Sequence, residues 1–461
     1  MIDYSTLLQP DLGQPARTIQ FIEKSAFDDW KAAQPASIRT LADANRFSAA
    51  PGDMMILPSP AGDTWSVLAG MAKEAGPWEL AGLCAQLPEG TYRIQSERPV
   101  QGALGWLLAH YRFARYRKDA EPMPLRVLLT AEAADIPETL RLAEATSLVR
   151  DLVNIPASDL GPEALEHEAE RLARSFGATL TITRGDALES GFPLVHAVGR
   201  AADRAHAPRM IELEWGDPSA PRVAIIGKGV IFDSGGLDIK PASAMRLMKK
   251  DMGGAAHALA LARLIMASGL PVRLHLLVPA VENAISGNAM RPGDIVRSRA
   301  GLTVEIDNTD AEGRLILADA LTRACEEAPD FILDYATLTG AARVALGPDL
   351  PALFANDDAL AQAFQAGAVT VQDPVWQLPL WSGYDDMLKS DLADMVNSGE
   401  GGMAGAVTAA LFLRKFVSEG TPWMHLDTFA WRSAAKPGRP KGGEALGLRA
   451  AWAFLKARYK G

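Results

Sequence analysis

The sequence predicts an α/β protein of two domains: a smaller N-terminal α/β domain and a larger C-terminal α/β domain with a mostly parallel central sheet flanked by helices. Three observations lead to this prediction. The chain has 461 residues, more than a single hydrophobic core ordinarily serves. Apolar runs of strand length alternate with longer helical patterns. The strand-like runs in the second half are apolar throughout, which is typical of parallel sheets covered on both faces.

The N-terminal third is predicted to contain both strands and helices. Short strands are expected at 53–59 and 65–71, and a buried strand at 125–131. Leu104, Leu107, Leu108 and Tyr111 recur at the spacing of one helix face. We expect an N-terminal domain over residues 1–135 and a connecting helix over 136–155. This part of the sequence carries no cluster of chemically reactive residues, so regulation, assembly or shielding of a site are its expected roles.

The C-terminal domain is expected over residues 156–461. Its first helix is predicted to start at Pro162, because proline is favoured in the first turn of a helix. Further helices are expected at 253–268 and 312–328, between strands at 222–229, 273–280, 302–306 and 331–338. Ligands of such sheets bind beyond the carboxyl ends of the strands. Polar residues that directly follow these strands are therefore the candidates for a functional site.

Composition narrows the class of protein. Asp and Glu number 56 against 46 Lys and Arg, a formal charge of −10 that argues against a general nucleic-acid or anionic-membrane binder. The two cysteines, Cys84 and Cys325, form no CxxC pair, which suits a reducing compartment. The N-terminal residues lack the pattern of a secretory signal, and no apolar run approaches the ~20 residues of a membrane span. We expect a cytoplasmic protein without a membrane partner.

Two segments that follow predicted strands, 227–254 and 306–321, carry an unusual density of charge. Four of their carboxylates would carry a charge of −4 if they met at one site, and two divalent cations would neutralise it. Carboxylate ligands suit Mg, Mn and Zn. Asp310 and Glu312 are two residues apart, so both can point to the same side of an extended segment. The charged candidates are Lys228, Asp233, Lys240, Asp251, Asp310, Glu312 and Arg314.

Each candidate also has an ordinary structural interpretation. Asp251 precedes a helical pattern and could serve as its N-cap, and Arg314 could form a plain surface ion pair with Glu312. Ser234, in "FDSGG", resembles a nucleophilic serine, but no histidine stands out as its base. His257 and His425 lie in apolar segments and are expected to be core histidines. No single charged residue indicates a metal site. The number of charged residues in two segments that follow strands does indicate one.

Several of these strings coincide with a known family. "NTDAEGRL" (308–315), "GKGVIFDSGGLDIKP" (227–241) and "DMGG" (251–254) resemble the leucyl aminopeptidase family of two-metal exopeptidases, and the resemblance extends over about 150–450. It implies hydrolysis of the N-terminal residue, leucine and others, from peptides with a free N-terminus by a water activated by two metal ions, Zn or Mn. It also implies a homohexamer. Another two-metal hydrolase, such as a phosphatase, remains the alternative.

The resemblance assigns roles position by position. Asp233 and Glu312 would bridge the two metals, Asp310 would bind the more exchangeable one, and Lys228 and Asp251 would complete the tighter one. Lys240 and Arg314 would be catalytic, with a bicarbonate held by Arg314 as the proton shuttle. The residues that would contact the substrate are Met248, Thr337, Leu338 and Gly340.

One departure from the family pattern concerns the same site. "HLDTFAW" (425–431) places Phe429 and Trp431 where many members have smaller residues. This bulk would reshape the site entrance, so a preference for leucine does not follow from the resemblance.

Overall fold

The computed structural model describes residues 2–59, 64–72, 76–95, 102–119 and 123–460, and every structural statement below concerns these residues. It forms two compact units. The N-terminal unit comprises Met1–Ser147 and Ser433–Lys441, and the C-terminal unit comprises Leu148–Arg432 and Gly442–Gly461. The division falls within one long helix, α5 (Ile136–Asn154).

The N-terminal unit is built on one sheet with strand order β1-β6-β5-β2-β4-β3 among the described residues. Neighbouring strands are parallel except for the antiparallel pair β3–β4. The strands predicted at 53–59, 65–71 and 125–131 are confirmed as β3, β4 and β6. The bounds are β1 (Leu8–Pro10), β2 (Arg17–Glu23), β3 (Met54–Pro58), β4 (Trp65–Met71), β5 (Gly90–Gln95), β6 (Arg126–Thr130), α1 (Phe27–Ala32), α2 (Ala36–Ala44), α3 (Glu79–Gln86) and α4 (Ala103–Leu108).

The C-terminal unit contains the large mixed sheet, whose order is β16-β15-β18-β14-β9-β11-β8-β7, with β10 paired to β11. At its centre β18, β14, β9 and β11 are parallel neighbours, which confirms the mostly parallel sheet expected from the sequence. The strands are β7 (Thr179–Arg184), β8 (Arg209–Trp215), β9 (Arg222–Gly227), β10 (Gly229–Asp233), β11 (Arg273–Asn283), β14 (Phe331–Ala336), β15 (Ala352–Ala355), β16 (Trp376–Gln377) and β18 (Trp423–Asp427).

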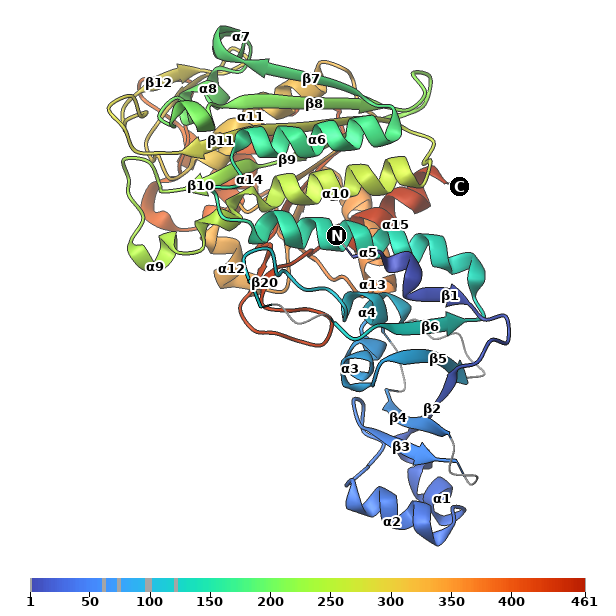
Figure 1. The fold of residues 1–461 in the computed structure, drawn as a ribbon. Coiled ribbons are helices and arrows are strands. Elements are labelled where there is room, and N and C mark those ends of the chain that lie inside the picture. Colours follow the sequence, from blue (N-terminus) through green and yellow to red (C-terminus); the bar gives the residue numbers. More distant parts are fainter. Residues whose placement is uncertain (1, 60–63, 73–75, 96–101, 120–122, 461) are drawn as a thin grey trace. The chain divides into compact units, whose positions relative to one another are not determined.

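Helices cover both faces of this sheet, and the alternation of side chains along β9 assigns two of them to opposite faces (Figure 1). A Cβ on Gly227 would lie 2.6 Å from Ala255 Cα of α10, so α10 packs on the face to which Gly227 points. Ala224 and Ile226 point the other way and belong to the same hydrophobic cluster as residues of α8, α11 and α14. The helices are α6 (Pro162–Phe176), α7 (Gly185–Gly191), α8 (Pro193–Gly199), α9 (Ala242–Met245), α10 (Gly253–Ala267), α11 (Glu312–Cys325), α12 (Gly340–Leu346), α13 (Asp358–Thr370), α14 (Gly405–Arg414) and α15 (Leu448–Tyr459).

One predicted strand lies elsewhere than expected. The segment predicted as a strand of the mostly parallel sheet at 302–306 forms β13 (Thr303–Glu305), which pairs with β12 (Ile295–Arg297) and β17 (Met395–Val396) in a separate small sheet. Its partner β12 is close in sequence and antiparallel, joined through a turn in which Ser298 N donates to Leu302 O. A local hairpin therefore takes the place of a crossover into the main sheet. A further pair of short strands comprises β19 (Trp431–Arg432) and β20 (Gly442–Gly443).

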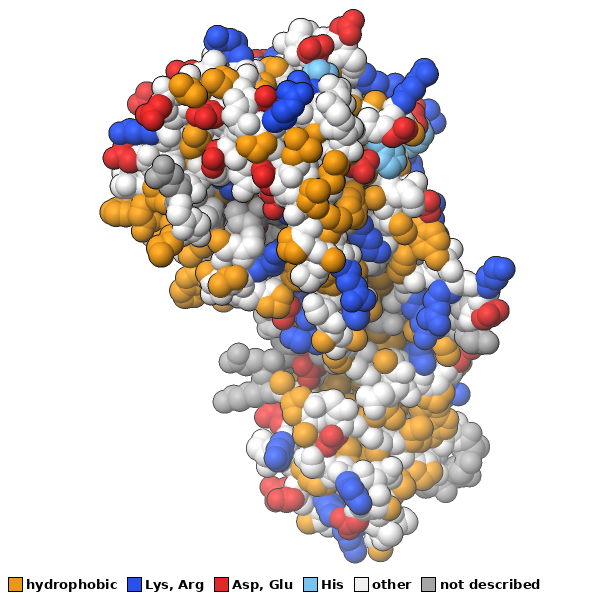
Figure 2. Space-filling model, turned by 90° about the vertical axis from the view of Figure 1, so that its left-hand side faces the viewer, with side chains coloured by type: hydrophobic (Ala, Val, Ile, Leu, Met, Phe, Trp, Pro, Cys, Tyr) orange, Lys and Arg blue, Asp and Glu red, His pale blue; other side chains and the backbone are white. Residues whose placement is uncertain are grey.

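The surface carries charges of both signs. On the face drawn in Figure 2, acidic and basic side chains are interspersed, with hydrophobic side chains between them. Among the described residues, no helix combines the length and the apolar character that crossing a membrane requires.

Candidate active site

The charged residues predicted from the sequence come together at the carboxyl ends of β9, β10 and β14. Lys228 stands between β9 and β10, and Asp233 is the last residue of β10. Asp251 lies in a 3-10 helix, η5 (Met248–Met252), that leads into α10, and Glu312 begins α11. Because parallel strands end at the same edge of a sheet, residues far apart in sequence meet there.

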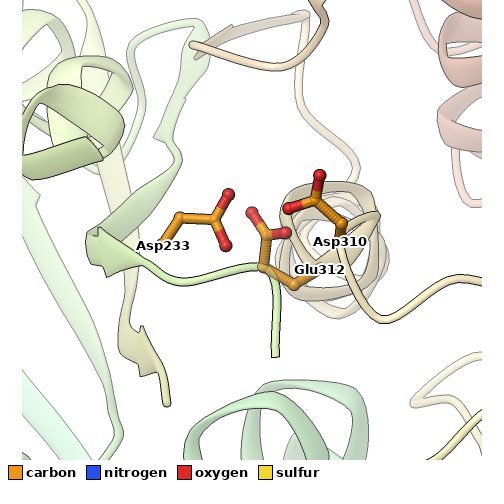
Figure 3. Close-up of side chains that lie close together, drawn as sticks. All are labelled: Asp233, Asp310 and Glu312. Carbon is orange, nitrogen blue, oxygen red and sulfur yellow. The ribbon is translucent and has the colours of Figure 1, made fainter. Parts of the chain in front are cut away.

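Three of the carboxylates converge on one point. Asp233, Asp310 and Glu312 each offer an oxygen, and these atoms lie within 4.8 Å of one another. Figure 3 shows the three carboxyl groups facing a common space, Asp233 from one side and the other two from the start of α11. Gly235, two residues after Asp233, adopts a φ of +88°, and a Cβ there would lie 2.4 Å from Asp238 O. Glycine is therefore required for the turn that carries the chain away from the cluster.

Two lysines bridge the carboxylates in pairs. Lys228 Nζ lies 2.6 Å from Asp251 Oδ2 and 2.9 Å from Glu312 Oε1. Lys240 Nζ lies 2.8 Å from Asp233 Oδ2 and also contacts Asp310. Five of these six side chains are largely or fully buried, and that of Asp310 is the more exposed one.

The protein's own cations do not balance this cluster. Burial and the neighbouring Asp233 raise the pKa of Glu312 to about 8, and the same two causes raise that of Asp310 to about 6. Asp251 behaves differently: burial opposes its ionisation, but Lys228 lowers its pKa to about 2. Oxygen donors with an excess of negative charge are the donor set that divalent cations prefer. The residues present therefore fit a divalent metal site.

The two lysines are held in their charged form by the same carboxylates. Burial by itself would lower the pKa of Lys228, but Asp251 and Glu312 raise it well above its usual range. Burial likewise opposes the charge on Lys240, and Asp233 outweighs it, so its pKa is also raised. An amine must lose its proton to bind a metal, so metal binding by Lys228 requires the loss of a proton that the carboxylates now stabilise.

Arg314 is buried beside this cluster and is not the surface ion pair considered above. Its Nη1 donates to Asn397 O at 2.8 Å, and burial lowers its pKa to about 10. Within the part of the chain that the structure describes, its buried Nε has no hydrogen-bond partner. The guanidinium is thus anchored at one end and retains an unused donor.

A cavity of about 260 Å³ opens over the cluster. Thr337 and Leu338 follow β14, and Gly340 begins α12, so these three candidates enter the cavity wall from one segment, and Met248 of η5 also lines it. The Thr337 hydroxyl donates to Asp251 Oδ1 at 2.8 Å. The structure therefore brings all eleven sequence-predicted candidates to one site: Lys228, Asp233, Lys240, Met248, Asp251, Asp310, Glu312, Arg314, Thr337, Leu338 and Gly340.

The structure excludes the ordinary interpretation of Asp251, whereas Ser234, His257 and His425 have structural roles. Asp251 is not the N-cap of α10, since Met252 occupies that position. Ser234 Oγ donates to Asn283 O at 2.6 Å and thereby links the ends of β10 and β11. His257 and His425 are fully buried in the sheet and its covering helix, as expected of core histidines.

Three residues of the site escaped prediction from the sequence. Asn283, at the end of β11, donates from Nδ2 to Asp233 Oδ1 at 2.9 Å and to Thr309 O at 3.1 Å. Lys250 and Arg343 line the same cavity. A signal for Asn283 is that it follows a predicted apolar strand, but its amide carries no charge and the predicted site was built from charged residues.

Comparison with known proteins agrees with this site. Residues 147–451 match the catalytic domain of the cytosol aminopeptidase family, and residues 18–129 match the N-terminal domain of M17 aminopeptidases. A probable cytosol aminopeptidase of Syntrophotalea carbinolica is 43% identical over 362 residues, which cover 75% of this chain and 72% of the relative. One from Roseiflexus castenholzii is 42% identical, with 75% and 73% covered.

Solved structures resemble the whole chain. The cytosol aminopeptidase of Coxiella burnetii superposes with a TM-score of 0.93 at 46% identity, over 98% of this chain and 99% of that one. The bottromycin maturation enzyme BotP in complex with Mn gives 0.85 at 35% identity, over 96% and 100%. The chain belongs to the cytosol aminopeptidase family, whose members are hydrolases, and the family resemblance inferred from the sequence is confirmed.

Proposed function

We propose that this protein is a metal-dependent aminopeptidase that removes the N-terminal residue from peptides. The observation that carries this proposal is the convergence of Asp233, Asp310 and Glu312 within 4.8 Å of one another, in a cavity that also holds Lys240 and Arg314. Membership of the cytosol aminopeptidase family supports the peptide substrate.

The metal ligands in this proposal are the five residues named from the sequence. Asp233 and Glu312 would bridge two divalent ions, Asp310 would hold the exchangeable one, and Lys228 and Asp251 would complete the tighter one. Bound there, divalent ions supply Lewis acidity that lowers the pKa of a water to near neutrality. The Mn complex of BotP supports Mn as one occupant, and the mixed oxygen and amine donors also suit Zn.

Lys240 and Arg314 act on the substrate in this proposal. The Lys240 ammonium, at 13% exposure, reaches the open side of the cluster and would stabilise the oxyanion that develops on the first peptide carbonyl. The Arg314 guanidinium, with a donor unused, would hold an anion, and bicarbonate is the anion we propose as proton shuttle.

The remaining candidates would position the peptide. Met248, Thr337 and Gly340 would surround the side chain of the first residue. The backbone N–H of Leu338 donates to Asp427 Oδ1 at 2.9 Å, so Leu338 would offer its carbonyl oxygen to the substrate. A free α-amine next to this carbonyl and the metal ligands would restrict cleavage to the N-terminus.

Replacing Glu312 tests the proposal. Glu312→Gln keeps the side-chain shape and removes the charge, so turnover of an aminoacyl anilide should be lost and metal binding weakened, while the circular dichroism spectrum is retained. Wild-type turnover by this variant would contradict the proposal. A phosphate monoester serves as the second substrate, since its hydrolysis in place of the anilide would indicate a phosphatase.

Domain organisation, assembly and location complete the proposal. All eleven predicted site residues lie within 228–340, which supports 156–461 as the catalytic metallopeptidase domain, with 1–135 and the helix 136–155 outside it. The large apolar side chains of Trp376 and Val369 are exposed, which supports an assembly in which they would be buried. We propose that this assembly is a homohexamer. The names of the relatives support a cytoplasmic location. Light scattering would measure the assembly mass.

A further inference from the structure

Two cations enter the active-site cavity without belonging to the carboxylate cluster. Lys250 comes from η5, one residue before Asp251, and Arg343 comes from α12. They meet at one aromatic ring: Lys250 Nζ lies 5.5 Å from the centroid of the Phe429 ring, and Arg343 Cζ lies 4.8 Å from it. Phe429 is one of the two bulky residues, with Trp431, that the sequence places where smaller ones were expected from the family resemblance.

The charge of Lys250 is poorly compensated. Its side chain is 1% exposed, and the nearest carboxylate oxygen, Asp251 Oδ1, is 3.5 Å away. Asp251 is already engaged by Lys228 at 2.6 Å and by the Thr337 hydroxyl at 2.8 Å. A buried cation without a close partner is costly, because it has lost its hydration and regained little.

Arg343 adds a second positive charge to the same wall. Its contact with Phe429 is a cation–π interaction, and among the described residues it forms no ion pair with a carboxylate. A ring can attract both cations, but it cannot neutralise them, and the two repel one another. The cavity wall to which Lys250 and Arg343 contribute therefore presents positive charge that the protein does not balance.

This charge lies where the first side chain of a substrate would lie. Arg343 Nη2 is 3.6 Å from the position that a Cβ on Gly340 would take. Lys250 is two residues from Met248 in the same 3-10 helix. Met248, Thr337 and Gly340 are the residues proposed to surround that side chain, so the same subsite ends at two cations.

We infer that this subsite selects a first residue whose side chain carries a carboxylate, glutamate or aspartate, and that Lys250 and Arg343 are the specificity-determining residues. The inference rests on the proposed aminopeptidase function. A guanidinium binds a carboxylate through two parallel hydrogen bonds, and an ammonium adds a point charge. A leucine side chain would leave both cations unpaired and Lys250 also dehydrated, and sites with unpaired buried polar groups discriminate strongly.

The C-terminal carboxylate of a dipeptide has the same chemistry and is the other source to distinguish. The position of Arg343 beside Gly340 favours the side chain, because Gly340 belongs to the first-residue subsite. Aminoacyl anilides have no C-terminal carboxylate, so they report on the side chain alone.

The test compares kcat/KM of the metal-loaded enzyme for glutamyl, aspartyl and leucyl p-nitroanilides. We expect the wild type to prefer an acidic substrate over leucyl. Arg343→Met and Lys250→Met should each lower the acidic-to-leucyl ratio at least tenfold, mainly through KM. Calorimetry provides a readout without turnover: L-glutamate should bind more tightly than L-leucine, and Arg343→Met should remove the difference.

Lys249→Met is the matched control. Lys249 neighbours Lys250, but its Nζ donates to Asn154 O at 2.6 Å and it does not line the cavity, so the ratio should stay at the wild-type value. Arg343 is only partly buried, so its variant decides the question if Lys250→Met does not fold.

The outcomes distinguish a failure of the proposed acidic specificity from a failure of the proposed aminopeptidase function. Cleavage of the leucyl anilide, with no preference for acidic substrates and no response to either substitution, would refute the specificity and leave the aminopeptidase function intact. Failure on every anilide would instead refute the function. If the substitutions slow hydrolysis of Leu-Ala but not of Leu-Ala amide, the cations bind the C-terminal carboxylate and the side-chain assignment is wrong.

Discussion

The Asn283 side-chain amide donates a 2.9 Å hydrogen bond to Asp233 Oδ1. The two residues are also register partners, because β10 pairs with β11 so that Asp233 lies opposite Asn283. The same Nδ2 donates to Thr309 O at 3.1 Å, next to Asp310. One neutral side chain thus orients the Asp233 carboxylate and ties the β10 end to the segment that carries Asp310 and Glu312, two of the proposed metal ligands.

Asn283→Ala should therefore weaken metal binding without removing a ligand. Loss of a hydrogen-bonding partner of a ligand typically costs about 10–100-fold in metal affinity or activity. We expect a loss of this size in the Mn or Zn dissociation constant, measured by competition with a chelating dye.

Asn288→Ala is the control for this experiment. Asn288 is an exposed asparagine whose Nδ2 donates to Arg200 O, away from the cluster. Equal metal affinity in the wild type and the Asn283 variant would mean that Asp233 needs no support from β11.

The predicted and the missed residues of the site differ in how far the local sequence determines their positions. Lys228 and Asp233 lie on either side of a short apolar run that follows a longer apolar run. Because these runs form strands, the direction of the strands determines the edge of the sheet at which the two residues lie. Asn283 was missed because the strand predicted at 273–280 extends in the structure to residue 283, through the polar Glu282. A prediction from apolar periodicity ends a buried strand at the first polar residue. A strand such as β11 can nevertheless continue past that residue to the functional site.

No local sequence pattern predicts that Lys250 and Arg343 lie close together. They meet because η5, α12 and the segment after β18 approach one another around Phe429. No spacing relates positions 250, 343 and 429. Such a cluster depends on tertiary packing, whereas Asp310 and Glu312 are two residues apart and share one segment.

Lys228 stabilises the metal-free protein by lying between two buried carboxylates, Asp251 and Glu312. Lys228→Met leaves these carboxylates without their cation, and breaking a buried ion pair typically costs about 3–5 kcal/mol. We expect a lower melting temperature in the chelator-treated variant. Divalent metal should reduce this deficit, because it supplies positive charge to the same carboxylates.

Differential scanning calorimetry with and without Mn measures both effects. Lys389→Met provides the comparison, since Lys389 is 75% exposed and forms only a surface pair with Asp386. A deficit that is the same in the chelated and metal-loaded states would argue against a shared role of lysine and metal in neutralising the cluster.

The two fully buried histidines should affect the pH dependence of stability with opposite sign. Burial alone would lower the pKa of His425, but Asp334, whose Oδ1 lies 2.5 Å from His425 Nδ1, raises it above the ordinary 6.5. Its stabilising contribution is complete below pH 6.5 and is lost as the pH rises through the raised pKa. Wild type and His425→Gln should differ most in unfolding free energy at low pH.

His257 should behave in the reverse manner. Its Nδ1 lies 2.7 Å from Gly253 O, and its Nε2 accepts from Leu446 N at 3.0 Å, an arrangement that requires the neutral ring. Burial lowers its pKa below 6.5, so its contribution is complete above pH 6.5 and is lost as the pH falls from there to the lowered value.

Urea unfolding of both glutamine variants between about pH 5.5 and 9 measures these contributions at constant metal concentration. The difference between wild type and His425→Gln should shrink as the pH rises, and that for His257→Gln should shrink as the pH falls. Because the two residues share the same core, each variant is the control for the other. Slopes of the same sign would show that the Asp334 carboxylate does not hold a proton on His425.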